Sequence, residues 1–132
     1  MATRILVVGH DPKTRKAMSR SLSLLGYEVA ETCGMRATDA VRSAAPDVVL
    51  TEVVMPDKCG IELIREIKQA NKDIRIIATS ADGALDRGYI LELARKLGAD
   101  LVLPEPFQIE ELRVCIERIL ERPANSDRRN SV

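Results

Sequence analysis

Six side chains in this 132-residue chain could do acid–base, phosphoryl or metal chemistry if the fold brings them together: His10, Asp11, Glu52, Cys59, Ser80 and Glu105. His10 is the only histidine. Because histidine changes its charge near neutral pH, it could form an ion pair or an acid–base pair with Glu52. All but Ser80 could also act as metal ligands, but no ligand spacing supports a metal site. Asp11 is better explained as a helix cap, because Pro12 follows it.

Strands must position these side chains, and short aliphatic runs in the sequence identify the strands. The run that ends at Val8 and the run from Val48 to Leu50 are apolar on both faces and too short for helices. Such runs are typical of central strands in a parallel sheet. The alternating stretch 27–31 is typical of an edge strand. The sequence therefore predicts five strands, within residues 4–8, 27–31, 48–50, 74–77 and 101–103.

Apolar residues at helical spacing predict one helix after each strand. Asp11 and Pro12 begin the first helix, and Gly26 can end it. Pro46 ends the second helix, and Gly98 ends the fourth. The third helix follows Gly60, and the last carries Leu112, Cys115, Ile116, Ile119 and Leu120 on one face.

This alternation predicts an α/β fold, with a parallel sheet covered on both faces and right-handed crossovers. In a flavodoxin-like, doubly wound sheet of strand order 2-1-3-4-5, ligands bind where the first and third strands diverge. Gly9, His10, Asp11 and Glu52 are expected at that point. Ser80 and Glu105 follow the fourth and fifth strands and should come close, so that these six residues line one pocket.

The composition excludes several classes of function. Lys and Arg together number 20, as do Asp and Glu, so no overall basic field attracts nucleic acid or a membrane surface. Aromatic residues make up 2%, too few to stack bases. No apolar run approaches the roughly 20 residues that span a bilayer, and the N-terminus lacks the layout of a signal peptide.

Three cysteines without CxxC spacing indicate free thiols, and hence a cytoplasmic protein. We expect one domain over residues 1–122, followed by a flexible polar tail at 123–132. Partners among nucleic acids and membranes are not expected.

The chain resembles a response-regulator receiver domain (CheY-like) from residue 4 to about residue 121. The resemblance rests on landmarks in the family's order and spacing: Ile5–Val8, Asp47–Leu50, Met55-Pro56, Gly60, Thr79-Ser80-Ala81, Gly98-Ala99-Asp100 and Pro106-Phe107. It implies two acidic residues after the first strand that hold magnesium, and an Asp after the third that takes a phosphoryl group from a histidine kinase. A Thr or Ser after the fourth strand and a Lys before the Pro-Phe contact that phosphoryl group.

This sequence departs from that pattern at most of these positions. Gly9 and His10 replace the acidic pair, Glu52 replaces the phosphoacceptor, and Glu105 replaces the Lys. Only Ser80 matches. Cys59 replaces an acidic residue before the glycine, and Val102 replaces the aromatic switch residue in the fifth strand. Phosphoryl transfer to a carboxylate needs nearby cations, so we expect this pocket not to perform it and magnesium binding to be lost or weak.

The resulting expectation is an atypical, stand-alone receiver domain that is not an enzyme, needs no cofactor and acts by phosphorylation-independent protein–protein interaction. The expected partner is a histidine kinase, an effector or another receiver, on the face spanning Leu85 to Leu120, and a weak homodimer is conceivable there. If exposed, five side chains would make this face basic-leaning, with Tyr89 as an anchor: Arg87, Arg95, Lys96, Arg113 and Arg118.

Three alternatives stay open. Asp11 could take the phosphoryl group, Glu52 could be a permanent mimic of the phosphorylated state that holds Ser80 inward, or His10 and Glu52 could serve an enzyme. The family's cis bond before the Pro-Phe is expected to survive as a cis Glu105-Pro106 peptide, since cis costs little before proline.

Overall fold

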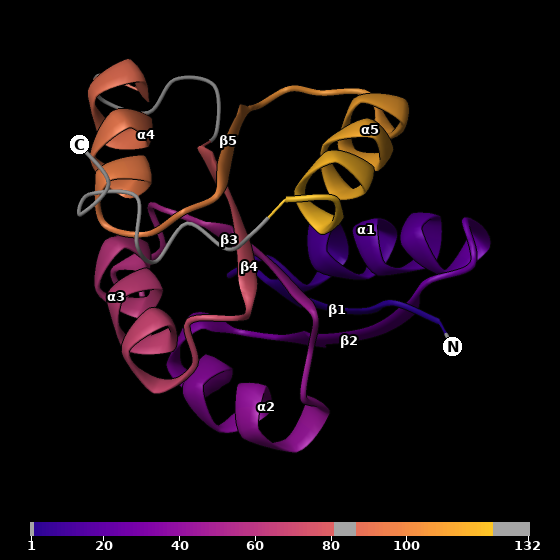
Figure 1. The fold of residues 1–132 in the computed structure, drawn as a ribbon, viewed down its shortest axis with the longest axis horizontal. Coiled ribbons are helices and arrows are strands. Elements are labelled where there is room, and N and C mark those ends of the chain that lie inside the picture. The colour runs from indigo at the N-terminus through magenta and orange to yellow at the C-terminus, as the bar shows by residue number, and fades with distance from the viewer. Residues whose placement is uncertain (1, 81–86, 123–132) are drawn as a thin grey trace.

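The computed structural model describes residues 2–80 and 87–122, and in these residues a five-stranded parallel sheet carries helices on both faces (Figure 1). The strands run side by side in the order β2-β1-β3-β4-β5, which confirms the predicted topology. Their bounds are β1 Arg4–Val8, β2 Glu28–Thr32, β3 Val48–Glu52, β4 Arg75–Ser80 and β5 Leu101–Pro104. Leu85, at the start of the predicted interaction face, and the predicted tail at 123–132 lie outside the described residues.

The helices form two layers, one on each face of the sheet. Helices α1 and α5 cover one face, and α2, α3 and α4 cover the other (Figure 1). Their bounds are α1 Pro12–Leu24, α2 Ala37–Ala44, α3 Gly60–Ala70, α4 Arg87–Lys96 and α5 Ile109–Leu120, with a short 3-10 helix, Gly34–Arg36, before α2. No helix among the described residues has the length and apolar character needed to cross a membrane.

The continuous aliphatic runs of β1 and β3 are explained by burial on both faces. Leu6 and Val49 belong to the core cluster under α2, α3 and α4, whereas Ile5 and Val48 belong to the cluster under α1 and α5. Each of these four side chains is at most 1% exposed. Because successive strand residues face opposite sides, both sides of a central strand must be apolar, as the sequence predicted.

Helix termini follow local rules that the sequence carries. The Asp11 carboxylate accepts hydrogen bonds from the backbone N–H and the hydroxyl of Thr14, at 3.4 and 2.6 Å, and so caps α1 as predicted. Helix α2 ends at Ala44, and the residue that caps it, Ala45, has a left-handed φ of 46°. Pro46 follows directly and cannot continue the helix.

Gly60 fixes the junction between β3 and α3. Its N–H donates to the carbonyl of Val53 at 2.8 Å. A Cβ added at this glycine would lie 2.4 Å from the Glu52 carbonyl oxygen and 2.6 Å from that of Val53. Only glycine therefore lets the start of α3 pack this closely on the end of β3, which is where Glu52 stands.

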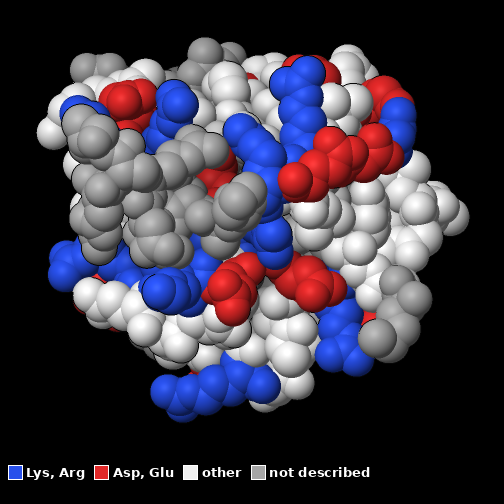
Figure 2. Space-filling view, in the orientation of Figure 1, with Lys and Arg blue, Asp and Glu red and all other residues white. Residues whose placement is uncertain are grey.

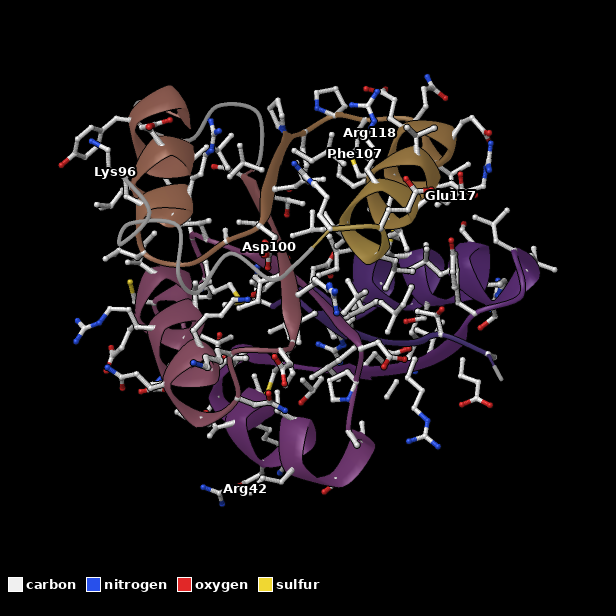
Figure 3. All side chains as sticks on the ribbon, in the orientation of Figure 1. Arg42, Lys96, Asp100, Phe107, Glu117 and Arg118 are labelled. Atoms are coloured by element: carbon white, nitrogen blue, oxygen red, sulfur yellow. The ribbon has the colours of Figure 1, made fainter. Side chains whose placement is uncertain are left out.

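A buried ion pair ties α3 to the other end of the sheet. The Lys68 ammonium lies 3.0 Å from the Asp100 carboxylate, and the two side chains are 7% and 5% exposed. Lys68 also donates to the carbonyl of Ile74 at 2.6 Å, and Asp100 accepts from the backbone N–H of Ile76 at 2.7 Å. Burial lowers the pKa of Lys68, and the charge of Asp100 opposes that effect. Asp100 lies close to the sheet, just before β5 (Figure 3).

Candidate functional site

The carboxyl ends of β1, β3, β4 and β5 meet at one edge of the sheet and bring the predicted site residues together. The strand register pairs Val8 with Thr51, Glu52 with Thr79 and Ser80 with Pro104. We call the residues at this edge the Glu52 site: Gly9, His10, Asp11, Glu52, Thr79, Ser80 and Glu105. Thr79 was not singled out in the sequence, although it precedes Ser80 in a quoted landmark.

The Glu52 side chain reaches across to β1 and lies against Gly9. A Cβ added at Gly9 would lie 2.6 Å from Oε1 of Glu52, closer than a Cβ atom comes to other heavy atoms in folded proteins. Gly9 is buried, and its carbonyl accepts a hydrogen bond from Arg15 at 2.8 Å. Arg15 is itself paired with Glu31 at 3.1 Å. The absent side chain at position 9 therefore provides the space that the glutamate carboxylate occupies.

His10 completes this contact. Its Nδ1 lies 3.2 Å from Oε2 of Glu52, so the two side chains that the sequence suggested as a pair are adjacent. The His10 side chain is 46% exposed and that of Glu52 is 20% exposed. A pair this open to water is worth at most about 1 kcal/mol. It orients Glu52 toward β1 more than it stabilises the fold.

Glu105 lies near enough to Glu52 for the two charges to interact. Burial, and then the negative charge of Glu52, raise the pKa of Glu105. A hydrogen bond from the Thr79 hydroxyl and the charge of His10 act in the opposite direction. The position next to Pro106 thus carries a carboxyl group whose ionised form is disfavoured. The Glu105-Pro106 peptide bond is cis, as predicted.

Ser80 and Asp11 contribute differently to the Glu52 site. Ser80 is 1% exposed, and its hydroxyl oxygen is buried without a hydrogen-bond partner among the described residues. The Asp11 carboxylate is occupied at the start of α1, and its hydrogen bond with the Thr14 hydroxyl is the main reason its pKa lies below the usual value. The described part of the chain holds no cluster of three or more histidine, cysteine or carboxylate side chains arranged as metal ligands.

Cys59 and Val102 take ordinary structural places. Cys59 is exposed immediately before α3, and all three cysteines are free thiols. Val102 is partly buried in β5 and packs against the core cluster under α2, α3 and α4.

On the face of α4, β5 and α5, Arg95, Lys96 and Arg118 are exposed, as the expected basic-leaning surface requires, whereas Arg113 is only partly exposed and is paired with acidic neighbours. The guanidinium of Arg113 contacts Glu110 and also lies 2.6 Å from Glu117. Figure 2 shows positive and negative side chains interleaved over α5, where Glu117 and Arg118 are neighbours (Figure 3). Tyr89 is 65% exposed, which suits the predicted anchor. Leu85 and the side chain of Arg87 are outside the described residues.

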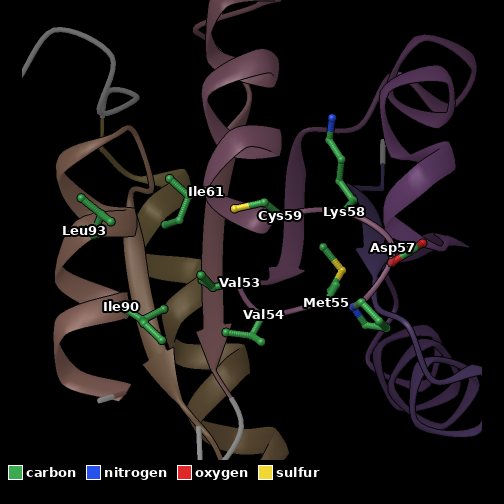
Figure 4. A pocket seen from close by; sticks show the side chains of 10 residues that line it. Val53, Val54, Met55, Asp57, Lys58, Cys59, Ile61, Ile90 and Leu93 are labelled. Atoms are coloured by element: carbon green, nitrogen blue, oxygen red, sulfur yellow. The ribbon is translucent and has the colours of Figure 1, made fainter. Parts of the chain in front are cut away.

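An apolar groove of about 450 Å³ opens beside the Glu52 site, between the loop that follows β3 and helices α3 and α4 (Figure 4). Ile61 of α3 and Ile90 and Leu93 of α4 form one wall, and residues 53–59 form the other. Asp57 and Lys58 point away from Ile90 and Leu93 (Figure 4). The sequence reasoning missed this groove, because it forms between segments that are distant in sequence.

Comparison with known proteins gives a consistent family. The model of the response regulator receiver domain matches residues 5–117. The response regulator MprA of Mycobacterium bovis is 35% identical over 134 residues, covering 100% of this chain and 56% of the relative. MprA of Mycolicibacterium vanbaalenii is 37% identical over 130 residues, covering 96% of this chain and 54% of the relative. The chain therefore spans little more than half the length of these relatives.

Solved structures agree with the fold. A putative response regulator from Chloroflexus aurantiacus superposes with a TM-score of 0.82 at 25% identity, covering 92% of this chain and 100% of that one. The receiver domain of NtrX from Brucella abortus has a TM-score of 0.81 at 26% identity, covering 89% and 98% of the two chains.

Proposed function

Since this chain belongs to the response regulator receiver domain family of two-component signalling, we propose that it is an atypical receiver that acts by protein–protein interaction without phosphorylation. The observation that carries the proposal is the Glu52 carboxylate lying against Gly9, where an added Cβ would be 2.6 Å from Oε1. A carboxylate held there, beside His10, is turned toward β1. We propose that this position keeps it from accepting a phosphoryl group.

The residues present do not suit magnesium, which the family implies. Mg²⁺ prefers near-octahedral oxygen ligands and usually binds through one or two carboxylates. Here Gly9 offers no side chain, His10 offers nitrogen, and Glu52 already lies 3.2 Å from His10. We therefore propose that magnesium binding is lost or weak and assign the metal no part in the function.

The electrostatics also oppose phosphorylation. Burial, and then the negative charge of Glu52, raise the pKa of Glu105, so a further negative charge beside these two carboxyl groups is expected to be unfavourable. Two unit charges about 4 Å apart repel by roughly 4 kcal/mol at an effective dielectric of about 20. A phosphoryl group would add about two more negative charges to this site.

The structure bears on each of the three alternatives. Asp11 is a poor candidate for phosphorylation because its carboxylate accepts two hydrogen bonds from Thr14. A mimic of the phosphorylated state would draw in Ser80, yet the Ser80 hydroxyl makes no hydrogen bond within the described residues. An enzyme built on His10 and Glu52 would need groups that position a substrate, and the open contact at 3.2 Å supplies none.

The partner is proposed from the family. Receivers interact with kinases and effectors, and the candidate surface comprises α4, β5 and α5, with Tyr89 exposed on α4. A weak homodimer on that surface, the stand-alone character and a cytoplasmic location remain predictions. Because the relatives named MprA are longer than this chain, no activity of a whole relative is transferred to it.

Intact mass after incubation with acetyl phosphate and magnesium tests the proposal. We expect the wild-type protein to gain no phosphoryl group. A matched variant that restores the family's residues (Gly9→Asp, His10→Asp, Glu52→Asp and Glu105→Lys) is the positive control and should gain one.

A stable gain of one phosphoryl group by the wild-type protein would overturn the proposal. Asp11→Asn and Glu52→Gln then identify the acceptor, because only the variant that lacks it should lose the mass gain. Tight magnesium binding by the wild-type protein, abolished by Glu52→Gln, would contradict the proposed loss of the metal.

A further inference from the structure

The first residue of β4 holds the end of α5. Arg75 begins β4, and its backbone N–H donates to the carbonyl of Asp47 at 3.1 Å. Its partly buried side chain donates from Nε to the carbonyl of Ile119 at 3.1 Å and from Nη2 to that of Arg122 at 2.7 Å. Both carbonyls lie at the end of α5, 44 and 47 positions further along the chain. Arg75 therefore ties a strand in the sheet to the end of a helix on its face.

The carbonyls that Arg75 contacts are those that a helix leaves without partners. The last carbonyls of an α-helix accept no hydrogen bond within the helix. The residue that caps α5, Glu121, has a right-handed φ of −87°, and its N–H donates back to Arg118 and Ile119. The Arg75 guanidinium adds charged donors at this end, where the helix dipole favours a cation. The cap of α5 thus comes from β4.

The planar guanidinium suits this contact. Two nitrogen atoms of one rigid group donate to two carbonyls three residues apart, whereas a lysine would present a single charged nitrogen on a flexible stem. A third hydrogen bond, from Nη1 to the carbonyl of Asp73, is longer at 3.4 Å. Arg4, which begins β1, instead directs its Nε to the exposed side chain of Glu28 at 3.3 Å. An arginine at the start of a strand therefore does not by itself hold a helix.

The body of α5 is held separately, by apolar contacts. Leu112, Ile116 and Ile119 are each at most 1% exposed and belong to the core cluster under α1 and α5. Leu120 packs against the same cluster. Between Leu120 and the end of the described residues at 122, no side chain joins either core cluster. The end of the helix therefore depends on Arg75 more than its body does.

The residues on either side of Arg75 are fixed by buried groups. Lys68 donates to the carbonyl of Ile74 at 2.6 Å, and the N–H of Ile76 donates to the Asp100 carboxylate at 2.7 Å. The side chains of Lys68 and Asp100 are 7% and 5% exposed and lie 3.0 Å apart. Arg75 therefore stands on a firm base, and the end of α5 is the part that moves if its hydrogen bonds break.

We propose that Arg75 is a latch that fixes the end of α5 to the sheet and sets the direction in which the segment after Arg122 leaves the domain. The Arg122 carbonyl belongs to the peptide bond that leads into Pro123, so a hydrogen bond to this carbonyl orients that bond. With the latch closed, residues 119–122 are held against β4. With the latch open, residues 121 and 122 separate from the sheet, while Leu112 and Ile116 keep α5 docked.

NMR relaxation of the ¹⁵N-labelled full chain tests the latch. In the wild-type protein we expect the amides of Glu121 and Arg122 to have order parameters of about 0.85, the value of a rigid backbone. Arg75→Met keeps an unbranched stem and removes every donor, so these values should fall below about 0.6, while that of Ile116 stays rigid. Residual dipolar couplings report the direction of the chain. Those of Glu121 and Arg122 should fit the alignment of the sheet in the wild type and be averaged in Arg75→Met.

Two further variants separate the latch from other effects. Arg75→Lys keeps the charge but cannot bridge the carbonyls of Ile119 and Arg122 with two fixed nitrogen atoms. It should therefore loosen Arg122 as Arg75→Met does. Arg4→Met removes the same type of side chain from the first residue of β1 and should leave α5 at its wild-type values.

Several results would overturn the latch. These are mobile amides at 121 and 122 in the wild type, unchanged values in Arg75→Met, wild-type values in Arg75→Lys, and equal loosening in Arg4→Met. Loss of order throughout α5, including Ile116, would also overturn it, because the whole helix would then depend on Arg75. The latch does not depend on the proposed loss of phosphotransfer. Arg75 and Ser80 are the two ends of β4, about 17 Å apart at 3.3 Å per residue, so the phosphotransfer assay tests a different place.

Discussion

Replacing Gly9 by alanine tests whether positions 9 and 52 share one space. In the wild-type protein the new Cβ would lie 2.6 Å from Oε1 of Glu52, so the carboxylate has to move. In a Glu52→Asp background the side chain is one methylene shorter, which withdraws its oxygens by about 1.5 Å. The same methyl group should then fit. We therefore expect the effect of Gly9→Ala on stability to depend on the residue at position 52.

The size of this dependence follows from the contacts. Pushing Glu52 off its preferred rotamer costs about 0.5–1.5 kcal/mol, and losing its exposed contact with His10 costs up to about 1 kcal/mol. Opposing this, alanine in place of glycine restricts the unfolded chain and stabilises by about 0.4–1 kcal/mol where the backbone allows it. We expect Gly9→Ala to be neutral or destabilising by about 1 kcal/mol in the wild type, and stabilising by about 0.5 kcal/mol with Asp at position 52.

The assay is urea unfolding at neutral pH of the wild-type protein, both single variants and the double variant. The four free energies of unfolding form a double-mutant cycle with an expected coupling of about 1 kcal/mol. Equal effects of Gly9→Ala in the two backgrounds, within about 0.3 kcal/mol, would refute the reasoning and with it the observation that carries the proposed function.

Three further outcomes are expected. Because the pKa of Glu105 is raised, its contribution to stability is complete below the unfolded value near 4.5 and is lost as pH rises through the higher folded value. Urea unfolding across this pH range should therefore show the free energy of unfolding of Glu105→Gln rising relative to that of the wild-type protein as pH increases. Lys68→Met should cost about 3 kcal/mol by leaving Asp100 buried without its cation, and Asp100→Asn in the same chain should recover part of that loss in urea unfolding. Gly60→Ala should lower the free energy of unfolding by about 2 kcal/mol, because its Cβ would meet backbone at 2.4 Å, whereas Gly88→Ala, whose Cβ meets no described atom within 4 Å, should stabilise α4 by up to about 1 kcal/mol.

The central places of β1 and β3 were predictable because burial on both faces requires continuous aliphatic runs, whereas the full strand order was taken from the flavodoxin-like fold. It also follows that Gly9, His10 and Glu52 meet, since the carboxyl ends of parallel strands share one edge. Strand ends were less predictable. Strand β4 extends through Ser80, although small and polar residues follow its aliphatic run, because hydrogen bonds to β3 and β5 decide where a strand ends.

Other features depended on information that lies outside any local pattern. The Lys68–Asp100 pair joins single residues 32 positions apart in the chain. The spacing of apolar residues along a helix or strand does not predict such a contact. The charge of α5 is different: Glu110, Arg113 and Glu117 stand at helical steps of three and four, so their pairing was readable from the sequence. The conformation of Glu52 was not readable, because it depends on the space that a missing side chain leaves at Gly9.

The position of the Glu52 carboxylate against Gly9 also bears on how a signal reaches this receiver. The Glu52 carboxylate contacts His10 and lies against Gly9, while the Ser80 hydroxyl on the neighbouring strand makes no hydrogen bond within the described residues. Glu52 is therefore coupled to the segment that leads into α1, where Asp11 caps the helix and Arg15 holds the Gly9 carbonyl. Reverting Glu52 to Asp alone would loosen the segment without supplying the cations that phosphotransfer requires.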